Sequence, residues 1–424
     1  MKINFPPSDF VLKGWEQIPV PRLAKVRQRF NDAHIIDLEG HIRAEMRTKI
    51  SQPERFCGKR ICITGSSRGI AHIDRMMKAV IEELKAWGAK PFLIPAMGSH
   101  AGGTAEGQRE MLASFGITEE TMGVPILSSM ETVQYSSLPD GTPLYVDRYA
   151  YESDGIVVMN KVKQHTNFHG KHESGLAKMM AIGLAKHEGA SLFHMKGFDT
   201  FAERIPQVCE EFLRCCPTAF GIGIVENAYN EILEVEAIPT EKILERDAAL
   251  LELAKENTAK FKYPRMDLIL IDEMGKEISG CGYDPNVVSH EVLDYKKIFV
   301  KSLSEGTHHN ACGIGNIDIV TRKYLNDVDW TVTWTNIATS TELFSGRIPM
   351  YVNTDREAVL VGLRCCNDVD FTRPSVVRIK NTHHMDEIWV SEAYWDHIRD
   401  REDVELLSEF EPIPFDEEGW MISE

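Results

Sequence analysis

The stretch from residue 155 to residue 194 reads GIVVMNKVKQHTNFHGKHESGLAKMMAIGLAKHEGASLFH. It begins with an apolar run, Gly155–Asn160, which predicts a buried β-strand. A polar loop follows. The next apolar run, Leu176–Ala185, is too long for a strand and indicates a buried helix. A strand, a loop and a helix in this order are typical of an α/β protein.

The charges of this stretch differ from those of the rest of the chain. The whole chain carries 64 Asp and Glu against 47 Lys and Arg, a formal net charge of −17. Between Lys161 and His187, however, five lysines and four histidines stand against a single acid, Glu173. A basic island at the carboxyl end of a strand in an acidic protein favours an anionic ligand in a cleft. A solvated basic loop is the alternative.

Composition excludes several classes of protein. A length of 424 residues predicts two domains, and 43% hydrophobic with 26% charged residues is ordinary for a globular protein. The negative charge argues against a nucleic-acid or anionic-membrane partner. No stretch approaches the roughly 20 apolar residues that span a bilayer, and the N-terminus lacks an apolar signal core, so we expect a cytoplasmic protein.

Strands alternate with helices in both halves, which predicts two α/β domains with an active-site cleft between them. We place the boundary near Tyr263-Pro264, giving an N-terminal domain of residues 1–263 and a C-terminal domain of residues 264–424 that closes over the site. The expected strands include 60–64, 90–95, 220–225, 266–272, 297–303 and 329–336, and the expected helices include 70–87, 240–260 and 356–365.

The segment Thr64–Ile70, TGSSRGI, lies between a predicted strand and a predicted helix. Small residues and backbone N–H groups at a helix N-terminus suit a phosphate or a carboxylate. Alone, the segment resembles the glycine-rich turn of short-chain dehydrogenases. The Tyr-x-x-x-Lys pair that accompanies that turn is absent from the sequence. A glycine turn that only begins a helix is a further alternative.

Three single residues are candidates for chemistry. His100 lies in a loop of small residues, PAMGSHAGG, where an imidazole is able to take a proton near neutral pH. Lys178 is an isolated cation among apolar residues, and desolvation would favour its neutral, nucleophilic form. The alternatives are an exposed histidine and a lysine that reaches from an amphipathic helix to water. His194, taken alone, reads as structural or exposed.

In this order, these residues resemble the nickel-pincer lactate racemase family. The resemblance covers at least residues 60–200, and it extends to 280–286 and 378–382 in the second half. It is carried by Ser66-Ser67-Arg68-Gly69, Gly98-Ser99-His100, Asn160-Lys161-Val162-Lys163-Gln164-His165-Thr166, Glu173-Ser174-Gly175-Leu176-Ala177-Lys178-Met179-Met180 and His194.

The resemblance implies a cofactor, a nickel-pincer nucleotide made by other proteins. This pyridinium mononucleotide bears two sulfur arms and a nickel ion. By order and spacing, Lys178 would be joined to it covalently and His194 would ligate the nickel. The glycine turn and the basic island would hold the phosphate, through Ser66, Ser67, Gly69 and Lys163.

The resemblance also implies a reaction, the racemisation or epimerisation of a 2-hydroxy acid. His100 and His165 would be paired acid/bases on opposite faces of the substrate. The hydrogen on carbon would leave as hydride to the cofactor, give a 2-keto acid and return to the opposite face. Arg68 would grip the substrate carboxylate.

The chain departs from the family pattern at several positions. Gln164 stands where family members commonly have proline, and His169 is a rival to His165 as the second base. Gly65 stands where lactate racemases carry an acid. These differences leave the substrate open among lactate-like and sugar acids. The rival functions are an NAD(P)-dependent dehydrogenase that uses Gly65–Gly69 and a non-catalytic nickel- or nucleotide-binding protein. The sequence is compatible with a homo-oligomer.

Overall fold

The computed structural model describes residues 1–67 and 69–422, which form two compact units. One unit is residues 32–258, and the other combines residues 1–31 with residues 259–424. The predicted boundary after residue 263 therefore differs by five residues from the end of the first unit. The larger difference is that residues 1–31 join the C-terminal unit. The predicted closure of one domain over the other stays a prediction.

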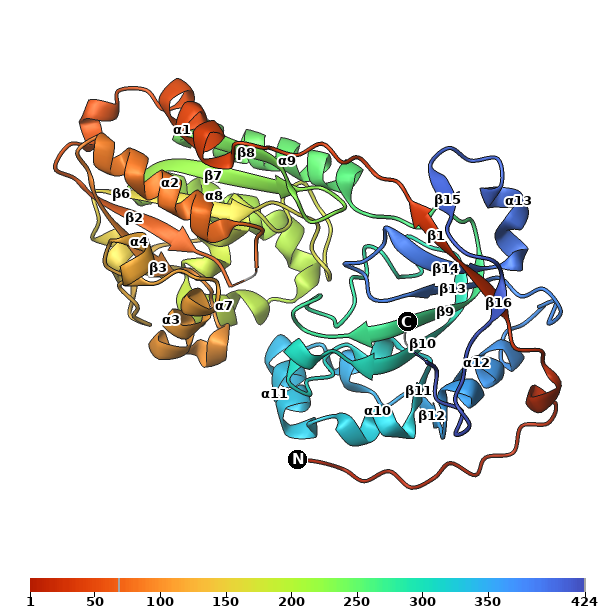
Figure 1. Cartoon of the computed structure of the whole chain (residues 1–424). Coiled ribbons are helices and arrows are strands. Elements are labelled where there is room, and N and C mark those ends of the chain that lie inside the picture. The colour runs from red at the N-terminus through yellow and green to blue at the C-terminus, as the bar shows by residue number, and fades with distance from the viewer. Residues whose placement is uncertain (68, 423–424) are drawn as a thin grey trace. The chain divides into compact units, whose positions relative to one another are not determined.

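The unit of residues 32–258 is built on a five-stranded sheet (Figure 1). The strands are β2 (Arg60–Gly65), β3 (Lys90–Pro95), β6 (Gly155–Lys161), β7 (Thr218–Glu226) and β8 (Ile232–Pro239), in the order β3-β2-β6-β7-β8. Neighbours from β3 to β7 are parallel, and β8 is antiparallel to β7. The apolar runs that predicted β2, β3, β6 and β7 are explained by burial of both faces of a parallel sheet. Strand β8 was not predicted from the sequence.

Two hydrophobic cores lie on the two faces of this sheet. Alternate strand residues enter different cores, as the two-residue period of a strand requires: Ile61 and Ile63 pack in one core and Cys62 in the other. The first core includes α1 (Leu38–Lys49), α2 (Ile73–Ala86) and α3 (Ala105–Ser114). The second includes α8 (Phe201–Cys215), α9 (Ile243–Asn257) and the hairpin β4 (Thr132–Ser137) and β5 (Pro143–Asp147).

The predicted helix after the basic loop is present but irregular. It consists of a short α6 (Leu176–Lys178), a π-helical turn (Met179–Gly183) and α7 (Lys186–His194). Gly183 permits this turn to approach the end of β3, because a Cβ there would lie 2.7 Å from the Ala96 carbonyl oxygen. Single π-helical turns occur frequently at functional sites.

The second unit contains a nine-stranded mixed sheet in the order β12-β11-β10-β9-β13-β14-β1-β15, with β16 paired to β1. Its strands are β1 (Arg22–Gln28), β9 (Met266–Met274), β10 (Tyr295–Leu303), β11 (Ile319–Thr321), β12 (Met350–Val352), β13 (Val376–Ile379), β14 (Glu387–Ser391), β15 (Val404–Leu406) and β16 (Glu411–Pro412). Its helices are α10 (Arg322–Asp327), α11 (Trp330–Ser340), α12 (Asp355–Arg364) and α13 (Trp395–Ile398). Both units are therefore α/β, as the sequence predicts.

The N-terminal residues join this sheet through β1. This strand pairs antiparallel with β14, with Ala24 opposite Val390, and also with β15 and β16. Figure 1 shows β1, in red, beside the blue strands β14 and β15. A strand whose partners lie more than 350 residues away gives no local signal of the sheet to which it belongs.

The predicted strand at 329–336 is wrong, because Asp329 is the N-cap of α11 and residues 330–336 lie in this helix. The Asp329 side chain caps the helix by accepting hydrogen bonds from the backbone N–H groups of Thr331 and Val332. Trp330 is fully buried, and its ring lies 5.1 Å from that of Trp334 one turn later. Capping and tertiary packing override the β propensity of Trp and Thr.

No helix within residues 1–67 and 69–422 combines the length and the apolar character needed to cross a bilayer.

Candidate functional site

Three loops that carry predicted site residues leave the same edge of the sheet. They follow the carboxyl ends of β2, β3 and β6, which are parallel neighbours with β2 in the middle. The chain passes from β2 outward to β3, and later from β6 outward to β7. The position between the carboxyl ends of β2 and β6 is therefore a topological switch point, the kind of position at which open α/β sheets bind ligands. The loops carry Ser66, Ser67 and Gly69; His100; and Lys163 and His165.

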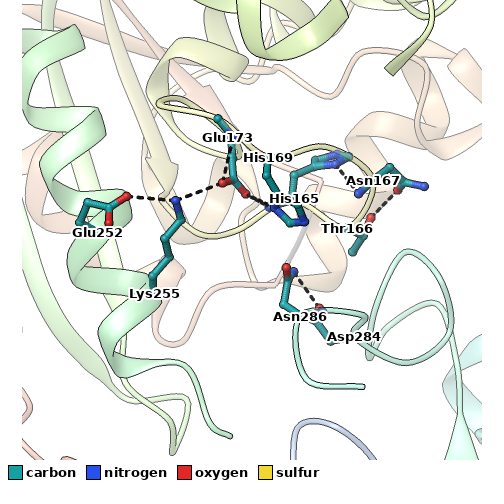
Figure 2. Close-up of polar contacts among 10 residues, drawn as sticks. His165, Thr166, Asn167, His169, Glu173, Glu252, Lys255, Asp284 and Asn286 are labelled. Carbon is teal, nitrogen blue, oxygen red and sulfur yellow. Dashed lines mark hydrogen bonds and ion pairs between the residues drawn. The ribbon is translucent and has the colours of Figure 1, made fainter. Parts of the chain in front are cut away.

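Glu173 organises the loop after β6, and Figure 2 shows its contacts. Its side chain is completely buried, although it is the single acid of the basic island. One carboxylate oxygen accepts the backbone N–H of His165 at 2.7 Å and lies 3.3 Å from His169 Nδ1. The other accepts the backbone N–H of Gly170 at 3.3 Å and pairs with Lys255 Nζ of α9 at 3.3 Å. A buried carboxylate thus holds both ends of the turn.

The hydrogen bond to the His165 ring defines which of its nitrogens carries the proton. The backbone N–H of Asn167 donates to His165 Nδ1 at 3.0 Å, so the neutral ring carries its proton on Nε2. The ring packs against two aromatic side chains, 4.4 Å from Phe168 and 5.8 Å from Phe198 between centroids. His165 therefore faces an aromatic cluster, whereas its rival His169 contacts Glu173.

Lys178 ends the short helix that begins at Leu176. Asp247 of α9 caps that helix, since its carboxylate accepts the backbone N–H of Leu176 at 2.6 Å. Gly175 allows this contact, because a Cβ there would lie 2.2 Å from the Asp247 carboxylate. The π-helical turn starts directly after Lys178, and the ammonium lies 5.8 Å from the centre of the Phe168 ring.

His194, the last residue of α7, also has a defined tautomer. Its Nδ1 donates to the Ala190 carbonyl at 2.7 Å, which leaves the Nε2 lone pair for a ligand. Burial lowers the pKa of His194, and the nearby Lys178 ammonium adds to that lowering. A neutral imidazole with one nitrogen held by a carbonyl is the form that binds transition metals.

The aromatic cluster joins these three residues. It consists of Phe168, Phe193, Phe198 and Phe201. The His194 ring lies edge-on to Phe198, at 5.6 Å, and 5.3 Å from Phe201. Phe198 therefore contacts both His165 and His194, and Phe168 contacts both His165 and Lys178. The structure brings the predicted second base, the predicted attachment lysine and the predicted nickel ligand to one cluster.

His100 lies on the neighbouring loop, after β3. Its Nδ1 is hydrogen-bonded to Ser67 Oγ, which joins it to the glycine turn after β2. The backbone N–H of Gly98 donates to the carbonyl of Gly183 at 3.0 Å, so this loop also contacts the π-helical turn that follows Lys178.

The glycine turn itself differs in part from the prediction. The helix expected from residue 70 begins at Ile73, so Gly69 and Ile70 belong to the loop. Arg68, predicted to grip the substrate carboxylate, lies outside the described residues. Lys163 lies at the base of the β6 loop, where its backbone pairs with Ser174 in both directions, at 2.8 and 3.1 Å.

Several residues that shape the site were not predicted from the sequence. These are Glu173 as an organiser, Asp247 as a cap and the four phenylalanines of the cluster. Glu173 had a local signal, because a lone acid within a basic island is expected to be paired. Asp247 had none, since it lies 71 residues from the amide that it caps. Among the described residues, no group of three or more His, Cys, Asp and Glu is arranged to hold a metal ion.

Comparison with known proteins identifies the N-terminal part of the chain. Residues 33–204 match the family model of the lactate racemase N-terminal domain. A crystal structure of a Thermotoga maritima protein is similar, with a TM-score of 0.51 and 13% identity, over 84% of this chain and 99% of that one. This likeness concerns the fold alone. The lactate racemase apoprotein of Thermoanaerobacterium thermosaccharolyticum has a TM-score of 0.47 and 14% identity, over 78% of this chain and 88% of that one.

No curated protein matches the chain. The matched segment, residues 33–204, contains the loops after β2, β3 and β6 and every residue of the predicted site. Residues 33–204 are thus similar to the N-terminal domain of lactate racemases, which confirms for this segment the resemblance predicted from the sequence.

Proposed function

We propose that this protein inverts the C2 carbon of a 2-hydroxy acid with the help of a nickel-pincer nucleotide. The match of residues 33–204 to the lactate racemase N-terminal domain supports a racemase-type activity. The observation that carries the finer proposal is the convergence of His165, Lys178 and His194 on one aromatic cluster. The proposed chemistry needs three kinds of group: an acid/base, an amine, and a neutral imidazole with a lone pair for a metal.

The residues fit the proposed cofactor in their chemistry. Lys178 supplies an amine for covalent attachment, and its contact with the Phe168 ring places it in a partly apolar setting. His194 supplies a neutral imidazole whose Nε2 lone pair points away from the Ala190 carbonyl bond. The small residues Ser66, Ser67 and Gly69 of the loop after β2, together with Lys163, would hold the phosphate through backbone N–H groups and a cation. When bound, the cofactor would supply a reversible acceptor for a hydride.

Two histidines would move the hydroxyl proton. His100, hydrogen-bonded through Nδ1 to Ser67, and His165 come from the loops after β3 and β6, the two neighbours of strand β2. In the tautomer found here, His165 presents an Nε2–H donor, and it would accept a proton only after its Nδ1 is released from the Asn167 N–H. Inversion requires a proton acceptor on one face of the substrate and a donor on the other. Burial of the aromatic cluster would exclude water from the reacting carbon. The role of Arg68 as a carboxylate clamp stays a prediction.

A label experiment tests this proposal. Protein co-produced with the cofactor-making proteins would be incubated in deuterated water with a panel of chiral 2-hydroxy acids. We expect inversion of at least one acid, with its C2 hydrogen retained, because a transferred hydride does not exchange with solvent. Deuterium at C2 would indicate a racemase that abstracts a proton instead. Absence of inversion across the panel, in protein that carries the cofactor, would favour a cofactor-binding protein without turnover.

A further inference from the structure

Lys186, the first residue of α7, is a completely buried cation that the proposed chemistry does not use. Its ammonium donates to the Pro95 carbonyl at 2.5 Å, at the end of β3. It also lies 3.0 Å from the Asp147 carboxylate and 3.4 Å from Gln108 Oε1. Burial raises the pKa of the Asp147 carboxyl, and the Lys186 ammonium opposes that shift. A buried ammonium needs partners of this kind.

Gln108 connects Lys186 to the loop that carries His100. The side chain of Gln108 is completely buried in α3. Its Oε1 faces Lys186, which orients the amide so that Nε2 points to the loop. Nε2 donates to the Gly98 carbonyl at 2.9 Å and to the His100 carbonyl at 3.3 Å. Lys186 therefore reaches the backbone of His100 through one side chain.

The backbone at Lys186 has an unusual conformation. Lys186 has φ of +54°, in the left-handed region that residues with a side chain rarely adopt. Such conformations persist where the surroundings determine them, and they are frequent at functional positions. Just before it, the Leu184 carbonyl accepts the backbone N–H of Asp147 at 2.7 Å. Lys186 thus links the end of the π-helical turn, the start of α7 and the end of β3.

We propose that Lys186 is a positioning residue that fixes the His100 loop relative to α7, the helix that ends at His194. It acts through Gln108 and does not touch the substrate. As a role in the reaction, this inference rests on the proposed function. Its structural part, the control of loop order by Lys186 and Gln108, is independent of any cofactor.

Gln108→Glu is the sharpest variant. The carboxylate still accepts from Lys186, but its second oxygen would face the carbonyl oxygens of Gly98 and His100 instead of donating to them. Lys186→Met removes the ammonium group that contacts Pro95, Gln108 and Asp147. Lys196→Met is the matched control, because Lys196 follows the same helix, is half-exposed and lies 3.8 Å from its partner Asp140.

The first measurement is backbone hydrogen exchange of the protein without cofactor. The amides of His100 and Gly103 report on the loop, since they donate to the Met97 and His100 carbonyls. We expect Gln108→Glu to speed their exchange about tenfold or more, with the strands of the sheet unchanged. Lys196→Met should match the wild type. Unchanged exchange at both amides, or an equal rise throughout residues 32–258, would overturn the proposal. If Lys186→Met fails to fold, the exchange rates of these two amides in Gln108→Glu decide the test.

The second measurement uses the loaded enzyme. We expect Gln108→Glu to lower kcat about a hundredfold with cofactor content and KM unchanged, because a displaced acid/base slows the chemical step. An unchanged kcat would overturn the role in the reaction. If the wild type takes up no cofactor, the proposed function fails, whereas the exchange result still stands by itself.

Discussion

The two loops that carry the histidines are held in opposite ways. In the loop after β6, the buried charge is negative, belongs to the loop and accepts its N–H groups: Glu173 binds the backbone of His165 directly. In the loop after β3, the buried charge is positive and lies outside the loop. There Lys186 acts through Gln108, which donates to loop carbonyls. The loop after β6 is therefore held by one side chain, Glu173, whereas the loop after β3 is held by two side chains in series, Lys186 and Gln108.

The largest effect should come from the histidines themselves. His165→Ala and His100→Ala should each lower the inversion rate by about 10²–10⁴, the usual contribution of a general acid or base, while the cofactor stays bound. The rate of inversion would be followed by chiral chromatography, with mass spectrometry of the same samples for the cofactor.

His169→Ala is the matched control for this prediction. The His169 ring contacts Glu173, so we expect His169→Ala to retain most of the activity. A severe loss in His169→Ala with activity preserved in His165→Ala would reverse the assignment of the second base.

Substitution of Glu173 should have the next largest effect. In Glu173→Gln, an amide group faces the backbone N–H groups from which the carboxylate accepts hydrogen bonds. The substitution also removes the buried negative charge that pairs with Lys255. We expect a loss of roughly 3 kcal/mol in the free energy of unfolding, mainly because the charge-assisted hydrogen bonds from the His165 and Gly170 backbone N–H groups are weakened or lost. Urea unfolding would measure it.

Lys255→Met separates the two sides of this pair. The Lys255 side chain is 28% exposed and also pairs with Glu252, so its removal should cost only about 1 kcal/mol. Equal losses in the two variants would show that the ion pair, rather than the hydrogen bonds to the loop backbone, stabilises this region.

The smallest effect concerns the pH dependence of stability at His194. Burial holds its pKa in the folded protein below the unfolded value of about 6.5. As the pH falls through that value, the unfolded chain gains a proton that the folded chain does not. Stability is therefore lost toward acid pH, by at most about 1.4 kcal/mol per pH unit.

His194→Gln should remove this dependence. The wild type without cofactor should lose more unfolding free energy than the variant between neutral and mildly acidic pH. Parallel curves would mean that His194 is not buried in its neutral form.

These comparisons also show which features can be predicted from sequence. Strands β2, β3 and β6 follow from apolar runs, and the loops after them follow from the polar and glycine-rich segments at their carboxyl ends. The order of small residues, histidines and Lys178 is sufficient to predict the resemblance to lactate racemases, which the family model bears out for residues 33–204. Such features are local, so one segment is enough to reveal them.

The remaining features depend on contacts between distant segments. The placement of β1 depends on β14, and the cap on Leu176 depends on Asp247. The helix at Trp330 depends on Asp329 and on burial, against the β propensity of its residues. The partners of Lys186 come from β3, α3 and β5, and no pattern around Lys186 predicts them.

The central claim is that Lys178 and His194 hold a nickel-bearing nucleotide. Intact-protein mass and metal analysis would test it most directly, on the wild type, Lys178→Ala and His194→Ala co-produced with the cofactor-making proteins. We predict a nucleotide-sized adduct that maps to Lys178 with equimolar nickel in the wild type. Lys178→Ala should lack the adduct, and His194→Ala should keep it with less nickel. An unmodified wild-type chain without nickel, under conditions that load a known family member, would contradict the claim.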